Sequence, residues 1–80
     1  MKDRKKRIKE LEEMIEVLLL AIPKEIISQK FYQSAIQKAT SDDTRDFFVS
    51  LVREEKGHEM RLRRILNDLQ AELSDLKASE

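Results

Sequence analysis

The fold of this chain centres on Glu54-Glu55-Lys56-Gly57-His58-Glu59, a stretch that contains its only histidine and its only glycine. In a helix, Glu55 and His58 are spaced i, i+3, which places both side chains on one face, where they could bind a single metal ion. Glutamate is so common in this chain that the spacing alone is a weak signal. Its meaning therefore depends on the surrounding sequence.

An apolar stripe passes through this motif. Alternating steps of three and four residues reach mostly apolar side chains: Phe48, Leu51, Glu55, His58, Leu62, Ile65, Leu69 and, past the polar Glu72, Leu76. This period is that of an amphipathic helix. Glu55 and His58 are therefore expected to face a core, where a carboxylate and an imidazole are costly unless they are paired or bound to metal.

The composition favours one small all-α domain. The chain is 40% charged and 40% hydrophobic, with one proline and one glycine, which is typical of long helices with charged surfaces. Sixteen basic and sixteen acidic residues cancel, so no net field favours nucleic acid as a partner. The lack of cysteine excludes disulfides, thiolate zinc sites and iron–sulfur clusters, and fits a cytoplasmic protein.

No membrane segment is expected. The apolar run over residues 14–22 contains Glu16 and is too short to span a bilayer. It is also a poor signal peptide, because acidic residues occupy the region before it that should be positive. The basic cluster at residues 2–9 could bind phosphates, but a solvated helix start that pairs with Glu10, Glu12 and Glu13 explains it better. We therefore expect a soluble protein.

The first half of the chain predicts a second long helix. From Ile8 the same stepping reaches Ile8, Leu11, Ile15, Leu18, Ile22, Glu25, Gln29, Tyr32, Ile36 and Ala39. Residues 40–44 form the one clear break, with Ser41 as N-cap of the helix that follows. We expect a single domain over residues 1–80, with helices over about 4–40 and about 42–77 packed as an antiparallel hairpin.

Two positions leave alternatives open. Pro23 does not change the phase of the stripe, so one helix kinked near residues 19–23 is favoured over two helices with Pro23 at the start of the second. Gly57 costs about 1 kcal/mol in a helix interior and permits either a close helix approach or a π-bulge.

In an antiparallel hairpin, residues at equal distances from the turn lie side by side. Glu25 is about as far before Ser41 as Glu55 and His58 are after it, so the three should share one layer roughly 24 Å from the turn. This convergence favours a metal site. The alternative is a purely structural salt bridge between Glu25 and His58.

Each helix also exposes an apolar seam that a hairpin of this size cannot bury alone. We therefore expect a homodimer, or a multiple of one, in which a twofold axis builds a four-helix bundle. Glu25, Glu55 and His58 then meet their symmetry mates, giving four carboxylates and two imidazoles. Such donors suit a di-iron or di-manganese carboxylate centre, with two metal ions per dimer.

Several motifs follow one another along the chain: Glu25, six or seven residues before the aromatic pair Phe31-Tyr32, then the turn at Ser41, Phe47-Phe48 and the Glu-x-x-His of Glu55 and His58. In this order they resemble the ferritin-like and rubrerythrin-like superfamily. The resemblance implies that Glu25 is the first-helix ligand, Glu55 the bridging ligand and His58 the terminal imidazole. It also implies that Tyr32 is hydrogen-bonded to a ligating carboxylate, and Gln29, one turn from Glu25, is a similar candidate.

The usual member of this superfamily has four helices and two copies of the motif, whereas this chain has one. The half-motif is similar to that of encapsulated ferritins, whose centre forms between two subunits. It implies a ferroxidase that oxidises Fe(II) with O2 or peroxide at a shared site, with an encapsulating shell left open as a partner. The competing hypothesis is a non-catalytic assembly module, in which Glu25 and His58 form a buried polar pin that fixes the register.

Overall fold

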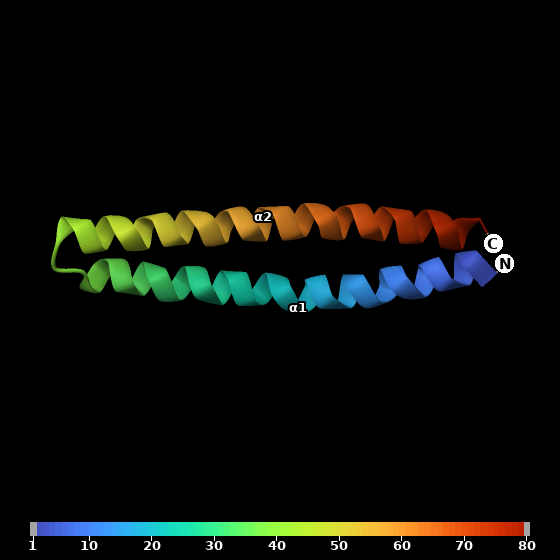
Figure 1. Ribbon diagram of the computed structural model, residues 1–80, viewed down its shortest axis with the longest axis horizontal. Coiled ribbons are helices and arrows are strands. Elements are labelled where there is room, and N and C mark those ends of the chain that lie inside the picture. Colours follow the sequence, from blue (N-terminus) through green and yellow to red (C-terminus); the bar gives the residue numbers. More distant parts are fainter. Residues whose placement is uncertain (1, 80) are drawn as a thin grey trace.

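Two long helices joined by a short turn form the structure. The computed structural model describes residues 2–79, in which α1 spans Lys2–Lys38 and α2 spans Asp42–Ala78. The helices lie antiparallel, so both ends of the chain meet at one end of a rod about 61 Å long (Figure 1). The predicted all-α hairpin is therefore confirmed for a single chain.

α1 continues through Pro23 without a break. Proline lacks a backbone N–H and its ring crowds the preceding turn, so a helix that contains it bends rather than stays straight. The ribbon of α1 bends gently near its middle (Figure 1). The helix tolerates this because four apolar side chains anchor it against α2 before the proline: Leu11, Ile15, Leu18 and Ile22.

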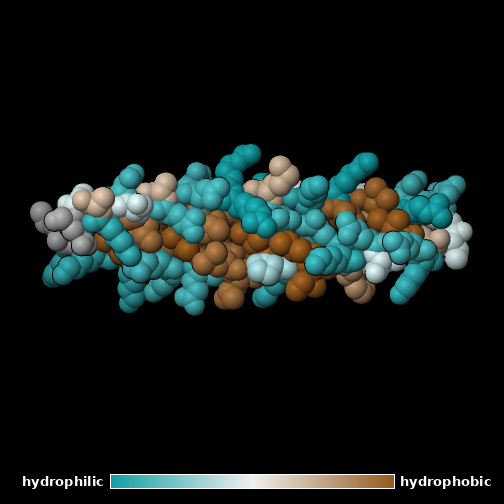
Figure 2. Space-filling view, turned by 180° about the vertical axis from the view of Figure 1, so that it is seen from behind, coloured by the Kyte–Doolittle hydropathy of each residue, from teal (hydrophilic) through white to brown (hydrophobic). Residues whose placement is uncertain are grey.

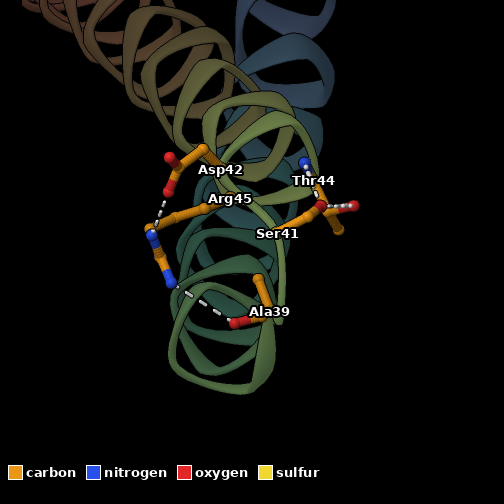
Figure 3. Close-up of polar contacts among 5 residues, drawn as sticks. All are labelled: Ala39, Ser41, Asp42, Thr44 and Arg45. Atoms are coloured by element: carbon orange, nitrogen blue, oxygen red, sulfur yellow. Dashed lines mark hydrogen bonds and ion pairs between the residues drawn. The ribbon is translucent and has the colours of Figure 1, made fainter.

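Ser41 caps α2, as the sequence predicts. Its backbone is extended, and its Oγ accepts a hydrogen bond from the Thr44 N–H at 3.2 Å. The Arg45 guanidinium then closes the turn by donating to Asp42 at 2.9 Å and to the Ala39 carbonyl at 3.4 Å (Figure 3). These contacts satisfy backbone groups that both helix ends would otherwise leave without partners.

The core lies between one stripe of each helix. Leu66 of α2 is buried against the apolar stripe of α1, with further apolar residues packed around it: Ile26, Leu62, Leu69 and Leu73. The predicted stripe of α2 is therefore partly wrong, because it includes Ile65, which is 47% exposed, and omits Leu66. A single neighbouring helix covers only a narrow arc of α2, so one edge of the predicted stripe stays outside the core.

Large apolar side chains stay exposed along the rod. They are Met14, Val17, Leu19, Leu20, Ile27, Phe31, Phe47, Met60 and Ile65. On one broad face, apolar side chains form a band between hydrophilic flanks (Figure 2). Within residues 2–79, neither helix has a stretch long and apolar enough to cross a membrane. Exposed apolar surface of this extent marks an interaction face.

Charged side chains hold the open end of the hairpin together. Arg7 donates to both carboxylate oxygens of Glu72, at 2.7 and 3.0 Å, and lies 3.6 Å from Glu10. The hydrogen bond from Arg7 lowers the pKa of Glu72. Arg4 donates to the carbonyl oxygen of Ser79 at 3.1 Å. Basic residues at the start of the chain thus form hydrogen bonds within the hairpin. The predicted i, i+3 pairing is confirmed for Arg7 and Glu10.

Candidate metal centre

Glu25, Glu55 and His58 meet in the central part of the rod. Each offers one ligand atom, and these three atoms lie within 4.8 Å of one another. Nδ1 of His58 is 3.5 Å from Oε1 of Glu55 and 3.7 Å from Oε2 of Glu25. Glu55 and His58 come from one turn of α2, and Glu25 comes from α1 opposite. The structure thus brings together the three residues expected to share a layer.

The two carboxylates are more buried than the imidazole. The side chains of Glu25 and Glu55 are 24% and 21% exposed, whereas that of His58 is 46% exposed. Oε2 of Glu25 is buried and has no hydrogen-bond partner among the described residues. A buried polar atom left without a partner costs about 1–3 kcal/mol. This oxygen therefore fits a group that a single chain does not supply, such as a metal ion.

Glu55 and Glu25 also interact with each other. The pKa of Glu55 is raised from its usual 4.5, first because the Glu25 carboxyl lies within hydrogen-bonding reach, then by burial and by repulsion from that carboxylate, while His58 opposes the rise. Two facing carboxylates resist ionising together, and a cation between them removes that repulsion. Oxygen and nitrogen donors of this kind suit Fe(II) and Mn(II).

A cavity of about 220 Å³ opens beside the three residues. It is lined by Glu25 and His58 together with Arg61, Leu62 and Ile65. The walls combine two site residues, one cation and two apolar side chains. His58 and Ile65 are both about half exposed, so this cavity faces solvent. We call the solvent-facing side that carries these two residues the open side of the hairpin. An ion can reach the site from there, and a second molecule can cover it.

Within one chain, Gly57 serves neither of the roles that the sequence left open. α2 is α-helical at this position, so there is no π-bulge. A Cβ added to Gly57 would meet only Nη2 of Arg61, at 3.9 Å, so no other helix approaches it within the hairpin. The missing side chain instead leaves room for the Arg61 guanidinium, which lies back over Gly57. The sequence did not lead us to predict that Arg61 lies beside the candidate site, although its i, i+3 spacing from His58 places it near that residue on the helix.

Gln29 binds a different carboxylate from the one expected. Its Nε2 donates to Oε1 of Glu59 at 2.8 Å, and Glu25 receives no hydrogen bond from it. Arg63 donates to the other oxygen of Glu59, also at 2.8 Å. These contacts, that of Gln29 first, lower the pKa of Glu59. Glu59 thus links the two helices next to the candidate metal centre.

Tyr32 belongs to an aromatic cluster on the turn side of the site. Its ring stacks on that of Phe48, with centroids 6.2 Å apart, and meets Phe31 edge-on. Among the described residues, no hydrogen bond joins its hydroxyl to a site carboxylate. Within one chain, Tyr32 therefore acts as a packing residue.

The comparison with known families agrees with this arrangement. The model of the family described as Rubrerythrin matches residues 2–80. No curated protein and no solved structure matches the chain significantly. The family match covers both helices and includes all three candidate ligands. The chain belongs to the rubrerythrin family.

Proposed function

We propose that this protein is a ferroxidase, in which two copies bind Fe(II) at a shared carboxylate–histidine centre and pass its electrons to O2 or peroxide. Membership of the rubrerythrin family implies iron binding. The observation that carries the proposal is the buried, unpartnered Oε2 of Glu25, next to the ligand atoms of Glu55 and His58. If this layer were purely structural, the unpartnered oxygen would destabilise the fold without serving any function.

One chain supplies too few donors for two metal ions. It offers two carboxylates and one imidazole, whereas di-iron carboxylate bundles take four carboxylates and two imidazoles. A homodimer with a twofold axis at the site doubles the set. In that arrangement Glu25 and His58 would be ligands to one ion each, and Glu55 would be the carboxylate shared by the two ions.

Iron is the substrate of this reaction. Two Fe(II) ions lose one electron each, and O2 takes up both electrons with two protons and leaves as hydrogen peroxide. Hard carboxylate oxygens bind Fe(III) more strongly than Fe(II), so Glu25 and Glu55 favour oxidation of the bound iron. The partly exposed His58 leaves an entry path on the cavity side. Mn(II), which takes the same donors, is the alternative metal.

Anaerobic titration with Fe(II), followed by addition of O2, tests the proposal. We expect about one iron per chain and an absorbance change that requires O2. Glu55→Ala and His58→Ala should lose both responses, while Lys56→Ala, whose side chain is exposed and lies on the other side of α2, should keep them. A folded 9.5 kDa monomer that binds no iron contradicts the proposal.

The second candidate is a non-catalytic assembly module held in register by a polar pin. The Glu25–His58 distance of 3.7 Å suits an ion pair but is too long for a hydrogen bond. The interhelical hydrogen bond in this region is instead the one from Gln29 to Glu59. A register pin therefore exists beside the site, so the site residues are not needed for that task.

A further inference from the structure

We infer that Glu54 and Arg61 form ion pairs between two copies of this chain, and that these pairs align the copies antiparallel with the twofold axis beside His58. The inference rests on the proposed function, because it takes the shared metal centre as the place where the axis passes. It adds the relative direction of the two copies and the side chains that determine it.

The open side of α2 is identified by its exposed apolar residues. Phe47 and Ile65 are 58% and 47% exposed. They stand eleven residues before and seven after His58, close to whole numbers of helical turns, so all three lie on one side. The cavity beside the site opens between α1 and this side, because Ile65 and His58 both line it. A second copy that completes the metal centre must cover this side.

Glu54 and Arg61 are seven residues apart on the same side of α2, with His58 between them. Both side chains are exposed. Neither takes part in an ion pair or a side-chain hydrogen bond within residues 2–79. The Arg61 guanidinium already lies over Gly57 at the edge of the cavity. One acidic and one basic group thus flank the site along the helix.

The position of the axis decides which of these groups meet. Ligands from two copies can share metal ions only if the axis passes close to Glu55 and His58. With an axis perpendicular to the rods, residues beyond His58 in one copy face residues before it in the other. Arg61 then faces Glu54 of the partner subunit, and the pair occurs twice. In a parallel dimer, Glu54 would face Glu54 of the partner subunit, and the two arginines would also meet, which is repulsive.

The distribution of apolar side chains fits the antiparallel arrangement. The site is in the central part of a rod about 61 Å long, so a reversed copy covers most of its length. Bulky apolar residues are exposed on both sides of the site, with Phe31 and Phe47 toward the turn and Val17 and Ile65 toward the open end. Reversal brings the aromatic half of each copy against the aliphatic half of the other, which buries both.

Charge reversal tests this arrangement. Glu54→Arg and Arg61→Glu each place like charges opposite one another at two points, so the dimer dissociation constant from sedimentation should rise about tenfold for each. The double variant with both changes should regain the wild-type constant. An equimolar mixture of the single variants should also associate normally, which shows that each is folded. Lys56→Glu, an exposed site on the other side of α2, should leave the constant unchanged.

The alternative outcomes overturn the inference. In a parallel dimer like charges already face each other, so single reversals change little and the double variant restores nothing. Iron titration separates this failure from that of the proposed function. If Fe(II) still binds at about one ion per chain while reversals leave the constant unchanged, the interface inference is wrong and the ferroxidase proposal stands. If the single variants weaken the dimer and the double variant restores it, but wild type binds no iron, the interface inference stands and the ferroxidase proposal is wrong.

Discussion

Oε2 of Glu25 lies 3.7 Å from Nδ1 of His58, across the interface between α1 and α2, and neither atom satisfies the other with a hydrogen bond. Glu25 receives no compensating donor from its own helix either. The two side chains are thus close enough to bind the same ion, but too far apart to satisfy each other by a direct hydrogen bond. The hairpin alone therefore gives up stability at this layer, a cost that is common at functional positions.

Replacing Glu25 with Gln should stabilise the metal-free protein. The change removes the repulsion of Glu55 and supplies an amide donor to it, a gain of about 1 kcal/mol. For a chain of this size, that corresponds to a rise of about 4–8 °C in melting temperature. Wild type should gain about 2.7 kcal/mol when free Mn(II) is a hundredfold above its dissociation constant, and the variant should lose most of that gain.

Thermal melts of both proteins, with and without Mn(II), measure these effects. Glu16→Gln, an exposed change away from the site, serves as the matched control and should move neither melt. A lower melting temperature for metal-free Glu25→Gln, together with no metal response in wild type, would instead support the structural pin.

Gln29 and Glu59 should be energetically coupled. Each single change to Ala should destabilise the protein by about 1 kcal/mol, because it removes the 2.8 Å hydrogen bond between the helices. The double variant should lose less than the sum, with a coupling of about 0.5–1.5 kcal/mol in denaturant melts. Additive losses would mean that the hydrogen bond does not hold the helices in register.

The Arg7–Glu72 pair should stabilise the hairpin only above acidic pH. Because Arg7 lowers the pKa of Glu72 in the folded state, the contribution is fully present above the usual value of 4.5 and is lost as pH falls below it through the folded pKa. Urea midpoints of wild type and Glu72→Gln should therefore differ at pH 7 and converge as the pH falls below 4.5 and Glu72 becomes protonated in the folded state. A difference of the same size throughout this pH range would show that the carboxylate charge is not responsible.

Ser41→Ala should destabilise the protein by about 1 kcal/mol, because the N-cap bond to Thr44 is lost. Ser41→Asp keeps an oxygen acceptor and adds a favourable charge at the helix start, so it should retain most of the stability. Chemical denaturation of the three proteins measures the effect. Equal losses for Ala and Asp would assign the effect to the hydroxyl contact with the Thr44 side chain instead.

The register of the hairpin could be predicted because it depends on few quantities. Helix rise is constant, and Ser41 marks the start of α2, so counting outward from the turn places Glu25 opposite Glu55 and His58. Helical periodicity assigns the side of a helix on which a residue lies. This was enough to bring the three candidate ligands into one layer.

Other contacts depend on the exact rotation of each helix and on side-chain rotamers, which helical periodicity does not determine. Ile65 and Leu66 are adjacent and both apolar, so which one faces α1 depends on a small rotation of α2. Gln29 lies one turn from Glu25 on α1 and faces Glu59 across the interface, and the choice between these two carboxylates depends on side-chain rotamers. The sequence therefore predicted the layer better than the hydrogen bonds around it.

Arg4 and Ser79 touch, so the hairpin begins and ends at the same end of the rod. In an antiparallel pair of hairpins whose axis passes beside His58, the last turn of one copy then lies at least a full rod length from the first turn of the other. A gene duplication that joined two copies into one polypeptide would need a connection able to reach across at least 61 Å, which takes at least about 18 residues of extended chain. A tandem protein of this architecture would thus carry a long crossover between its second and third helices, whereas the other two connections could stay as short as the turn at Ser41.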